Sequence, residues 1–289
     1  MNKLIVAVAI LLLLALSGCI NIPDRHSVMS QRGNINAVHT TNGCDPDRLV
    51  EHRASTSEQA AKLDAGGFSL LVWNVLKGKR SDWTSDFLRF CSEKDLLIIQ
   101  EAYLTEEFRN MLQKKQYNWD MSIAFEYRNI KAGVLTASKI EPSFVCTFQK
   151  KEPLIRIPKT ILITMYPLSG RDQFLLVANL HLINYTMSVS QFRAQVRQMQ
   201  RILSKHPGPL IVTGDFNTWS DKRMAVIDDA AGHLNLKAVT FKDNNRSLVL
   251  GHHVDHIYYR GLEPFEAIST AVTTSDHNPL QIKFRLPAR

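Results

Sequence analysis

The sequence has few cysteines, and none of them forms a recognisable metal-binding pattern. Cys19, Cys44, Cys91 and Cys146 include no CxxC pair and no cysteine–histidine spacing typical of zinc. We therefore expect no structural zinc site. The three cysteines that follow Cys19 in the sequence cannot all pair among themselves. An oxidising compartment would allow one disulfide among them.

The sequence also lacks internal repeats and any strong bias in composition. Hydrophobic residues make up 45% and charged residues 21%, as in ordinary globular proteins. With 289 residues, the chain is long enough for one large α/β-type domain. Its net charge of +8 favours anionic partners such as nucleic acid, phospholipid headgroups or phosphorylated substrates, without choosing among them.

The apolar run near the N-terminus is too short for a comfortable membrane span. Lys3 precedes uninterrupted apolar sequence over 4–16, which has the length of the hydrophobic region of a secretory signal. The following Leu-Ser-Gly-Cys19 resembles the lipobox of bacterial lipoproteins, which implies cleavage before Cys19 and lipidation of Cys19. The alternative is a plain signal peptide followed by a chance cysteine.

Lipidation would anchor the protein to a membrane of the cell envelope. Ile20 rather than Asp follows the cysteine, so the familiar inner-membrane retention signal is missing and we expect the outer membrane, facing the periplasm. Residues 20–66 have few large apolar residues and no sustained periodicity. We therefore expect a signal peptide over 1–18, a flexible tether over 19–66 with a short helix near 57–63, and a folded domain over 67–289.

Strand-like apolar runs dominate the folded domain. Several short runs between 121 and 180 have no helix between them, which favours antiparallel pairing. Helical spacing of apolar residues predicts helices over 82–91, 105–112, 189–203 and 220–231. Strands are expected over 68–74, 95–101, 121–127, 133–137, 143–149, 160–166, 173–180, 210–214, 236–241, 254–260 and 280–284.

The stretch over 210–219, Leu-Ile-Val-Thr-Gly-Asp-Phe-Asn-Thr-Trp, organises this pattern. Its apolar run predicts a buried strand that ends at Gly214, followed by Asp215 and Asn217 on the same side of an extended backbone. An ordinary strand-to-loop turn would also fit this stretch alone. Other strands end in similar chemistry, however, at Asn74, Glu101, His181, Asp255, Asp276 and His277.

Hard oxygen ligands without thiolates suit Mg²⁺, Mn²⁺ or Ca²⁺ rather than zinc. A metal beside two histidines and an Asp/Asn pair suits phosphoester hydrolysis, because it offsets charge on the phosphoryl oxygens while a histidine accepts a proton from water. The sequence thus predicts a metal-dependent hydrolase.

The motifs that end these strands resemble those of the endonuclease/exonuclease/phosphatase superfamily, which includes DNase I-like nucleases. They are Val-Trp-Asn74, Ile-Gln-Glu101, Asn-Leu-His181, Gly-Asp215-Phe-Asn217, Val-Asp255-His-Ile and Ser-Asp276-His277-Asn-Pro, in the superfamily's order. Further stretches such as Tyr-Tyr-Arg-Gly-Leu are similar to the bacterial YafD-like branch, from which the lipobox departs. The resemblance implies an α+β fold, a four-layer sandwich of two packed, mostly antiparallel β-sheets flanked by helices.

The same resemblance implies roles for the site residues. Glu101 would bind Mg²⁺ or Mn²⁺ with Asn74 and Asp276 nearby, and His277, oriented by Asp255, would be the general base or stabilise the phosphate. Asp215 and Asn217 would position water or the scissile phosphate, and His181 would contact phosphate or protonate the leaving oxygen.

The substrate stays open at this stage. A nuclease-like phosphodiesterase ranks first, a phospholipid or phosphoinositide headgroup hydrolase second, and a non-catalytic envelope binding protein third; no protein partner can be inferred. Two further patterns carry weaker signals. Arg193, Arg197 and Arg201 indicate a solvated helix face more than a ligand site, and the cluster of His252, His253 and His256 fits no familiar metal spacing.

Overall fold

The computed structural model describes residues 20–41, 43–51, 61–186 and 188–288. The predicted signal peptide and the predicted lipidation residue Cys19 lie outside this range. Among the described residues, no helix combines the length and the apolar character needed to cross a membrane.

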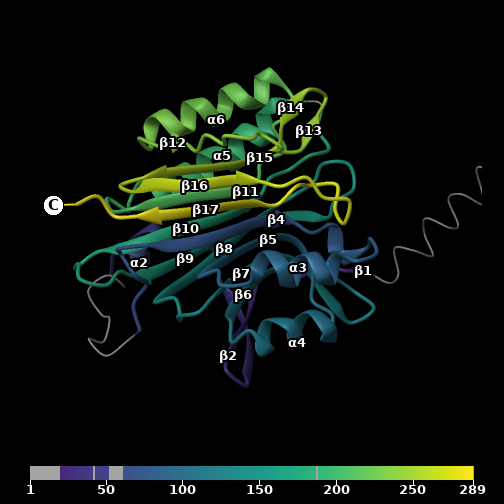
Figure 1. Ribbon diagram of the computed structural model, residues 1–289. Helices are drawn as coiled ribbons and strands as arrows, with labels where there is room; N and C mark the ends of the chain where they lie inside the picture. The colour runs from purple at the N-terminus through teal and green to yellow at the C-terminus, as the bar shows by residue number, and fades with distance from the viewer. Residues whose placement is uncertain (1–19, 42, 52–60, 187, 289) are drawn as a thin grey trace, which may run out of the picture.

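The described chain is built on two large mixed β-sheets (Figure 1). The first has the strand order β16-β17-β4-β5-β7-β6-β2-β3, with β1 also paired to β6. Its strands are β1 (Ile20–Asn21), β2 (His26–Arg32), β3 (Ile35–Thr41), β4 (Phe68–Asn74), β5 (Leu96–Tyr103), β6 (Asn118–Tyr127), β7 (Ile130–Ser138), β16 (Glu263–Ser269) and β17 (Leu280–Arg285).

The second sheet has the order β12-β15-β11-β10-β9-β8. Its strands are β8 (Phe144–Lys151), β9 (Pro158–Pro167), β10 (Phe174–His181), β11 (Leu210–Asp215), β12 (Lys237–Ala238) and β15 (Asp255–Arg260). A small hairpin of β13 (Leu248–Val249) and β14 (His252–His253) precedes β15. Most neighbouring strands in both sheets are antiparallel, but β4 with β5 and β10 with β11 are parallel.

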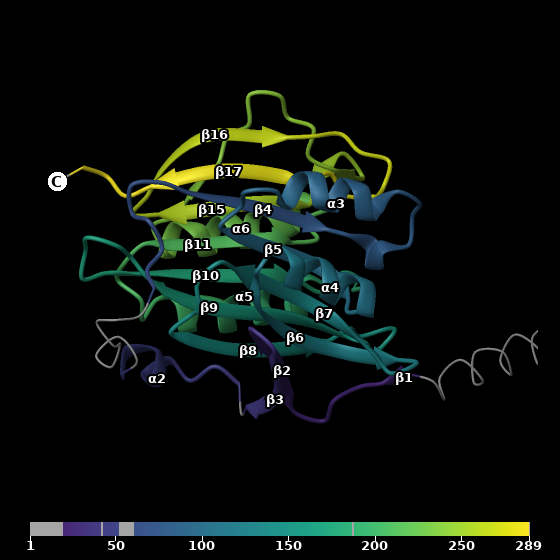
Figure 2. The ribbon, with the colours of Figure 1, turned by 60° about the horizontal axis from the view of Figure 1, so that its bottom comes forward.

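The two sheets pack face to face, and helices cover their outer faces (Figure 2). Apolar side chains such as Leu70, Ile98, Val177 and Ile211 fill the space between the sheets. Helices α3 (Trp83–Cys91) and α4 (Glu106–Lys114) pack on the first sheet. This arrangement confirms the predicted α+β four-layer sandwich.

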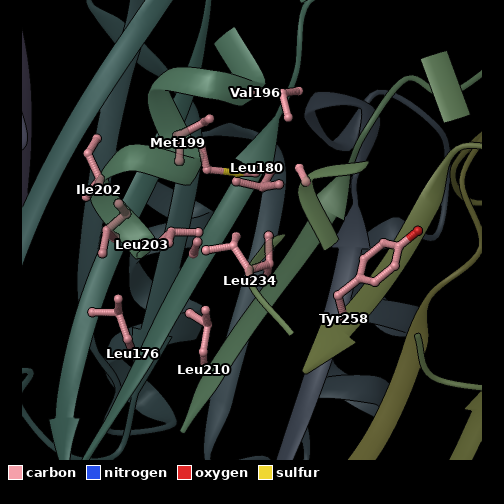
Figure 3. Close-up of a cluster of buried hydrophobic side chains, with 14 of the residues drawn as sticks. Leu176, Leu180, Val196, Met199, Ile202, Leu203, Leu210, Leu234 and Tyr258 are labelled. Carbon is pink, nitrogen blue, oxygen red and sulfur yellow. The ribbon is translucent and has the colours of Figure 1, made fainter. Parts of the chain in front are cut away.

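Helices α5 (Val189–Leu203) and α6 (Asp221–His233) cover the second sheet. The apolar stripe of α5 packs on Leu176, Leu180 and Leu210 of β10 and β11 (Figure 3). Burying this stripe supplies most of the stability of such a helix, at roughly 25 cal/mol per Å² of apolar surface. The predicted amphipathic helix over 189–203 is therefore confirmed.

The parallel strand pairs bring polar strand ends to one end of the sandwich. In the first sheet, Asn74 at the end of β4 is in register with Gln100, the neighbour of Glu101 in β5. In the second sheet, His181 at the end of β10 is in register with Asp215 at the end of β11. The antiparallel strand β15 begins with Asp255 opposite Asp215. We call this end of the molecule the site end.

The tether predicted over 19–66 is wrong for much of the described segment. Strands β2 and β3 form a hairpin that extends the first sheet through pairs between β2 and β6. The short helix α2 (Pro46–Glu51) follows, and a disulfide joins Cys44 to Cys146 of β8. The two strands of this hairpin bury few residues, so the hairpin carries little of the apolar pattern on which the prediction relied.

Some smaller predictions also fail, each for a local reason. The helix expected near 57–63 lies partly outside the described residues, and 61–63 are not helical. The strand expected over 236–241 shrinks to β12, and β16 was not predicted because Pro264 interrupts its pattern, which is tolerated here at the edge of the sheet. By contrast, the helix predicted over 105–112 is present as α4, and Thr105 caps it, since its side chain accepts a hydrogen bond from the backbone N–H of Phe108.

Candidate active site

Asp215 lies at the centre of the polar groups at the site end. The chain reaches it through Gly214, whose φ of +133° is a conformation that residues with a side chain rarely adopt. A Cβ at this position would lie 2.2 Å from the carbonyl oxygen of Leu180. Glycine thus allows β11 to pass close to β10 just before the carboxylate.

Residues from three other strand ends or loops surround the Asp215 carboxylate. Asn74 Nδ2 donates a hydrogen bond to Asp215 Oδ2 at 3.1 Å. His181 Nε2 lies 3.3 Å from the same oxygen, and His277 Nε2 lies 3.9 Å from it. Asp215 Oδ1 accepts a hydrogen bond from the backbone N–H of Asn217 at 2.9 Å. One oxygen therefore faces both histidines while the other fixes the loop.

His277 is held in place from two sides. Its Nδ1 contacts Asp255 Oδ2 at 2.7 Å, and its backbone carbonyl accepts a hydrogen bond from Trp73 Nε1 at 2.8 Å. Burial alone would lower the pKa of the imidazole, but the carboxylates of Asp255 and Asp215 raise it to about 10. His277 is therefore an imidazolium at neutral pH, which favours the phosphate-stabilising role over the general-base role.

Glu101 is a partly buried carboxylate that stays ionised. Its φ is +49°, at the position where the pairing of β5 with β7 is interrupted by a bulge, and its carboxylate forms an ion pair with Lys77. Burial alone would raise the pKa of Glu101, but charge on His181, Lys77 and Lys159 lowers it to about 2. Because His181 is neutral at physiological pH, the two lysines carry most of this effect there.

His181 faces a lysine as well as Asp215. Its Nε2 lies 2.5 Å from Nζ of Lys159, which is near the start of β9. Burial, reinforced by the charge of Lys159, lowers the pKa of His181 to about 3. Burial also lowers the pKa of Lys159 itself. With so low a pKa, His181 is neutral at physiological pH and lacks the labile proton that protonation of a leaving oxygen would need.

Arg223 fastens the loops that carry His181 and Asn217. This buried guanidinium, from α6, donates to the carbonyl oxygens of Ile183 at 2.8 Å and Asn217 at 2.9 Å. It also lies over the ring of Trp219, 4.3 Å from the centroid. Asn217 in turn donates from Nδ2 to the carbonyl of Leu182 at 2.9 Å. Asn217 thus fixes the loops beside the reacting groups.

A cavity of about 160 Å³ opens beside Glu101, Lys159 and His181. Its polar side also includes Lys77, whereas its other walls are mainly apolar. Those walls include Phe125, Ile155, Ile157 and Tyr185. The cavity combines two cations with room for an apolar substituent.

The donor chemistry of Glu101 and Asn74 fits a hard divalent cation, but the predicted ligand set is not assembled. Within the described residues, no group of three or more His, Cys, Asp or Glu side chains is arranged to hold a metal ion. Asp276 is exposed and accepts a hydrogen bond from Ser275 Oγ at 3.4 Å, and Asn74 Oδ1 accepts one from the backbone N–H of Leu76. Magnesium commonly binds through one or two protein carboxylates, so Glu101 is the residue that fits.

The weaker sequence signals lie elsewhere. His256 is buried against Thr218, His253 contacts Asn244, and His252 lies near Asp221, so the three do not share one ligand. The stripe of Arg193, Arg197 and Arg201 is exposed on α5, where it lines a groove with Asp229 and His233 of α6.

Sequence reasoning missed Lys77, Lys159, Arg223 and Glu152. Each is a charged residue without a motif, and only the fold shows its partners. The buried Glu152, for example, accepts hydrogen bonds from the backbone of Asn184 and Tyr185, which joins the β8–β9 hairpin to the loop after His181.

This chain is similar to a known protein family and to bacterial proteins. The match to the "Endonuclease/Exonuclease/phosphatase family" covers residues 71–277. A UPF0294 protein of Vibrio campbellii is 34% identical over 267 residues, covering 92% of this chain and 90% of the relative. A UPF0294 protein of Vibrio vulnificus is 36% identical, covering 82% of this chain and 83% of the relative.

Solved structures share the fold at low sequence identity. The human Nocturnin catalytic domain has a TM-score of 0.59 and 18% identity, covering 78% of this chain and 97% of that domain. An endonuclease/exonuclease/phosphatase from Bacteroides vulgatus has a TM-score of 0.56 and 17% identity, covering 76% and 99% of the two chains. Together with the ordered motifs, the family match over residues 71–277 shows that the chain belongs to the endonuclease/exonuclease/phosphatase family.

Proposed function

We propose that the protein is a divalent-metal-dependent phosphodiester hydrolase. The observation that supports this most is the Asp215 carboxylate, which faces the neutral imidazole of His181 on one side and the cationic imidazole of His277 on the other. Such a site offers a proton acceptor and fixed positive charge within a few ångströms. This is the combination that attack of water on a phosphodiester requires.

The chemistry of the residues follows from their contacts. A water held between Asp215 Oδ2 and His277 Nε2 loses a proton to Asp215 as its oxygen bonds to phosphorus. The phosphorus–oxygen bond to the leaving group breaks, and the departing oxygen takes a proton from solvent. His277 and Lys159 offset the negative charge that builds on the non-bridging oxygens, while Asp255 keeps His277 charged and oriented.

Glu101 would hold the metal, with Asn74 nearby. When bound, Mg²⁺ or Mn²⁺ would supply Lewis-acid stabilisation of charge on the phosphate. The ionised state of Glu101, maintained by the two lysines, favours this role.

Two classes of substrate fit the sequence. Nucleic acid follows from the net charge of +8, and a phospholipid headgroup follows from the proposed lipidation of Cys19 in the cell envelope. The exposed side chains at the site end favour the second class.

The test is hydrolysis of bis-p-nitrophenyl phosphate by the purified protein with Mg²⁺ or Mn²⁺. We expect turnover that stops in EDTA and returns when excess metal is added. A His277→Ala variant is the control for contaminating enzymes, because the substitution would not change the turnover that such enzymes cause. Undiminished turnover in EDTA would refute metal dependence, and equal turnover by the variant would refute the site.

A further inference from the structure

Two hairpin tips with exposed apolar side chains flank the site. The β8–β9 turn leads directly into Lys159, and the β13–β14 hairpin leads directly into Asp255. Leu154 in the first turn is 77% exposed, and Leu250 in the second is 80% exposed. Ser247 also accepts a hydrogen bond through Oγ from the backbone of Asn278, which fastens the second hairpin beside His277.

Most of the large apolar side chains that are exposed in the described part of the chain lie on these tips or beside them. A soluble surface rarely gathers such residues around one opening unless something covers them. The set consists of Leu154, Ile155, Tyr185, Leu248, Val249 and Leu250.

Basic residues accompany the apolar tips at the site end. Lys79 and Arg80 follow β4, Arg128 is in the β6–β7 turn, and Lys151 and Arg156 are in the β8–β9 hairpin. All five are exposed. Exposed acidic residues also lie here, among them Asp82 and Asp276, but none of them is on the β8–β9 turn or the β13–β14 hairpin. Apolar tips with a basic surround are complementary to an anionic lipid surface.

The chain also enters the fold at this end. Ile20 pairs with Tyr127 at the end of β6, next to the β6–β7 turn (Figure 2). The preceding residue in the sequence is Cys19, the proposed lipidation residue. An anchor at Cys19 would therefore leave almost no free chain between the membrane and the site end.

The cavity beside Glu101 connects these features to the chemistry. Ile155 of the apolar tip and Tyr185 line it together with Lys159 and His181. A ligand with a phosphate on the cations and a hydrocarbon part on the apolar wall would satisfy both sides of the cavity.

We propose that the site end docks on an anionic phospholipid bilayer, with the β8–β9 and β13–β14 tips inserted, and that the substrate is a phosphodiester of a membrane lipid. The substrate part rests on the proposed hydrolase function. Docking itself depends only on the surface and can be measured without turnover.

Docking is tested with an environment-sensitive fluorophore on the full chain reconstituted into vesicles. The probe is attached at Leu154→Cys or Leu250→Cys, and the protein without an added cysteine supplies the background. Ile35→Cys is the matched control, because Ile35 is 73% exposed but lies at the opposite end of the molecule, in the β2–β3 hairpin. With vesicles of equal parts phosphatidylcholine and phosphatidylglycerol, we expect a blue shift at the two tips and none at Ile35. Equal spectra at all three positions would overturn docking.

The substrate is tested by comparing hydrolysis of phosphatidylglycerol in those vesicles with hydrolysis of bis-p-nitrophenyl phosphate. The double variant Leu154→Asp/Leu250→Asp should lower the ratio of the two rates at least tenfold, whereas Ile35→Asp should not. Turnover of plasmid DNA or RNA with inert vesicles would overturn the lipid assignment. If neither ester is hydrolysed while the fluorophores shift, docking stands and the hydrolase function fails.

Discussion

Asp255 and His277 lie 22 residues apart in the sequence, yet the carboxylate Oδ2 of one is 2.7 Å from the Nδ1 of the other. This contact keeps His277 positively charged and fixes the direction of Nε2 toward Asp215. The pair is the residue arrangement on which the proposed chemistry depends most directly.

Removing the charge of Asp255 should therefore remove most of the activity. We expect Asp255→Asn to lower kcat for bis-p-nitrophenyl phosphate by about 10²–10⁴-fold, comparable with His277→Ala. The double variant should be little worse than either single one, because the two residues act as a unit. Asp172→Asn, in the exposed turn at the other end of the sandwich, is the control. If the fold losses of kcat in the two single variants multiply in the double variant, the shared role is contradicted.

Lys159 should contribute positive charge to the site. Lys159→Met is expected to lower kcat/KM by about 10²-fold, the size of effect seen when one stabilising donor is lost. The pKa of His181 should also rise from about 3 in this variant, because the charge of Lys159 helps to lower it. Histidine NMR signals followed through a pH titration would report that change.

Lys150→Met is the matched control, since Lys150 pairs with Lys159 in the neighbouring strand but does not line the cavity. Equal losses of kcat/KM in the Lys159→Met and Lys150→Met variants would indicate a general effect of surface charge.

His256 should make the protein less stable as the pH falls. Burial, reinforced by the charge of Arg246, lowers its pKa to about 3 in the folded state, against 6.5 ordinarily. A base with a lowered folded pKa contributes stability above its unfolded pKa and loses it as the pH falls toward the folded pKa. Between pH 6.5 and about pH 4, this one group should cost about 1.4 kcal/mol of unfolding free energy per pH unit.

Urea unfolding at several pH values would measure this dependence. His256→Gln should lose less unfolding free energy per pH unit than the unmodified protein, whereas the exposed His233→Gln should behave like the unmodified protein. Parallel pH profiles for all three proteins would contradict the assignment to His256.

The Cys44–Cys146 disulfide should contribute substantially to stability. It closes a loop with a sequence separation of 102 residues, and cross-links of this kind typically contribute about 2–4 kcal/mol. Reduction, or the Cys44→Ser/Cys146→Ser variant, should lower the free energy of unfolding by that amount. Reduction should not change the free energy of unfolding of the double variant. The buried Cys91 thiol should react with thiol reagents only on unfolding. If a reductant lowers the free energy of unfolding equally in both proteins, this contribution does not come from the disulfide.

The sequence predicted the sandwich and most of the site because both depend on local patterns. Apolar runs gave nearly every central strand, and the parallel pairs then placed Asn74, His181 and Asp215 together. Asp276 shows the limit of this reasoning. It is adjacent to His277 in the sequence, but its side chain is exposed.

The unpredicted parts depend on contacts between distant segments. Asn179, for instance, donates across the interface to the carbonyl of Leu135 at 3.0 Å, so this polar residue joins the two sheets within their apolar core. Lys159 and Arg223 likewise acquire partners only through the fold. Charge alone carries no information about such partners.

The β2–β3 hairpin has a consequence for the order in which the molecule is built. Its partner strand β6 begins at Asn118, so a ribosome must add many more residues before β2 can find the edge on which it docks. The hairpin is thus complete long before the strand on which it docks has been synthesised. Until β6 is made, β2 presents an unpaired edge, the kind of surface on which chaperones and neighbouring chains compete.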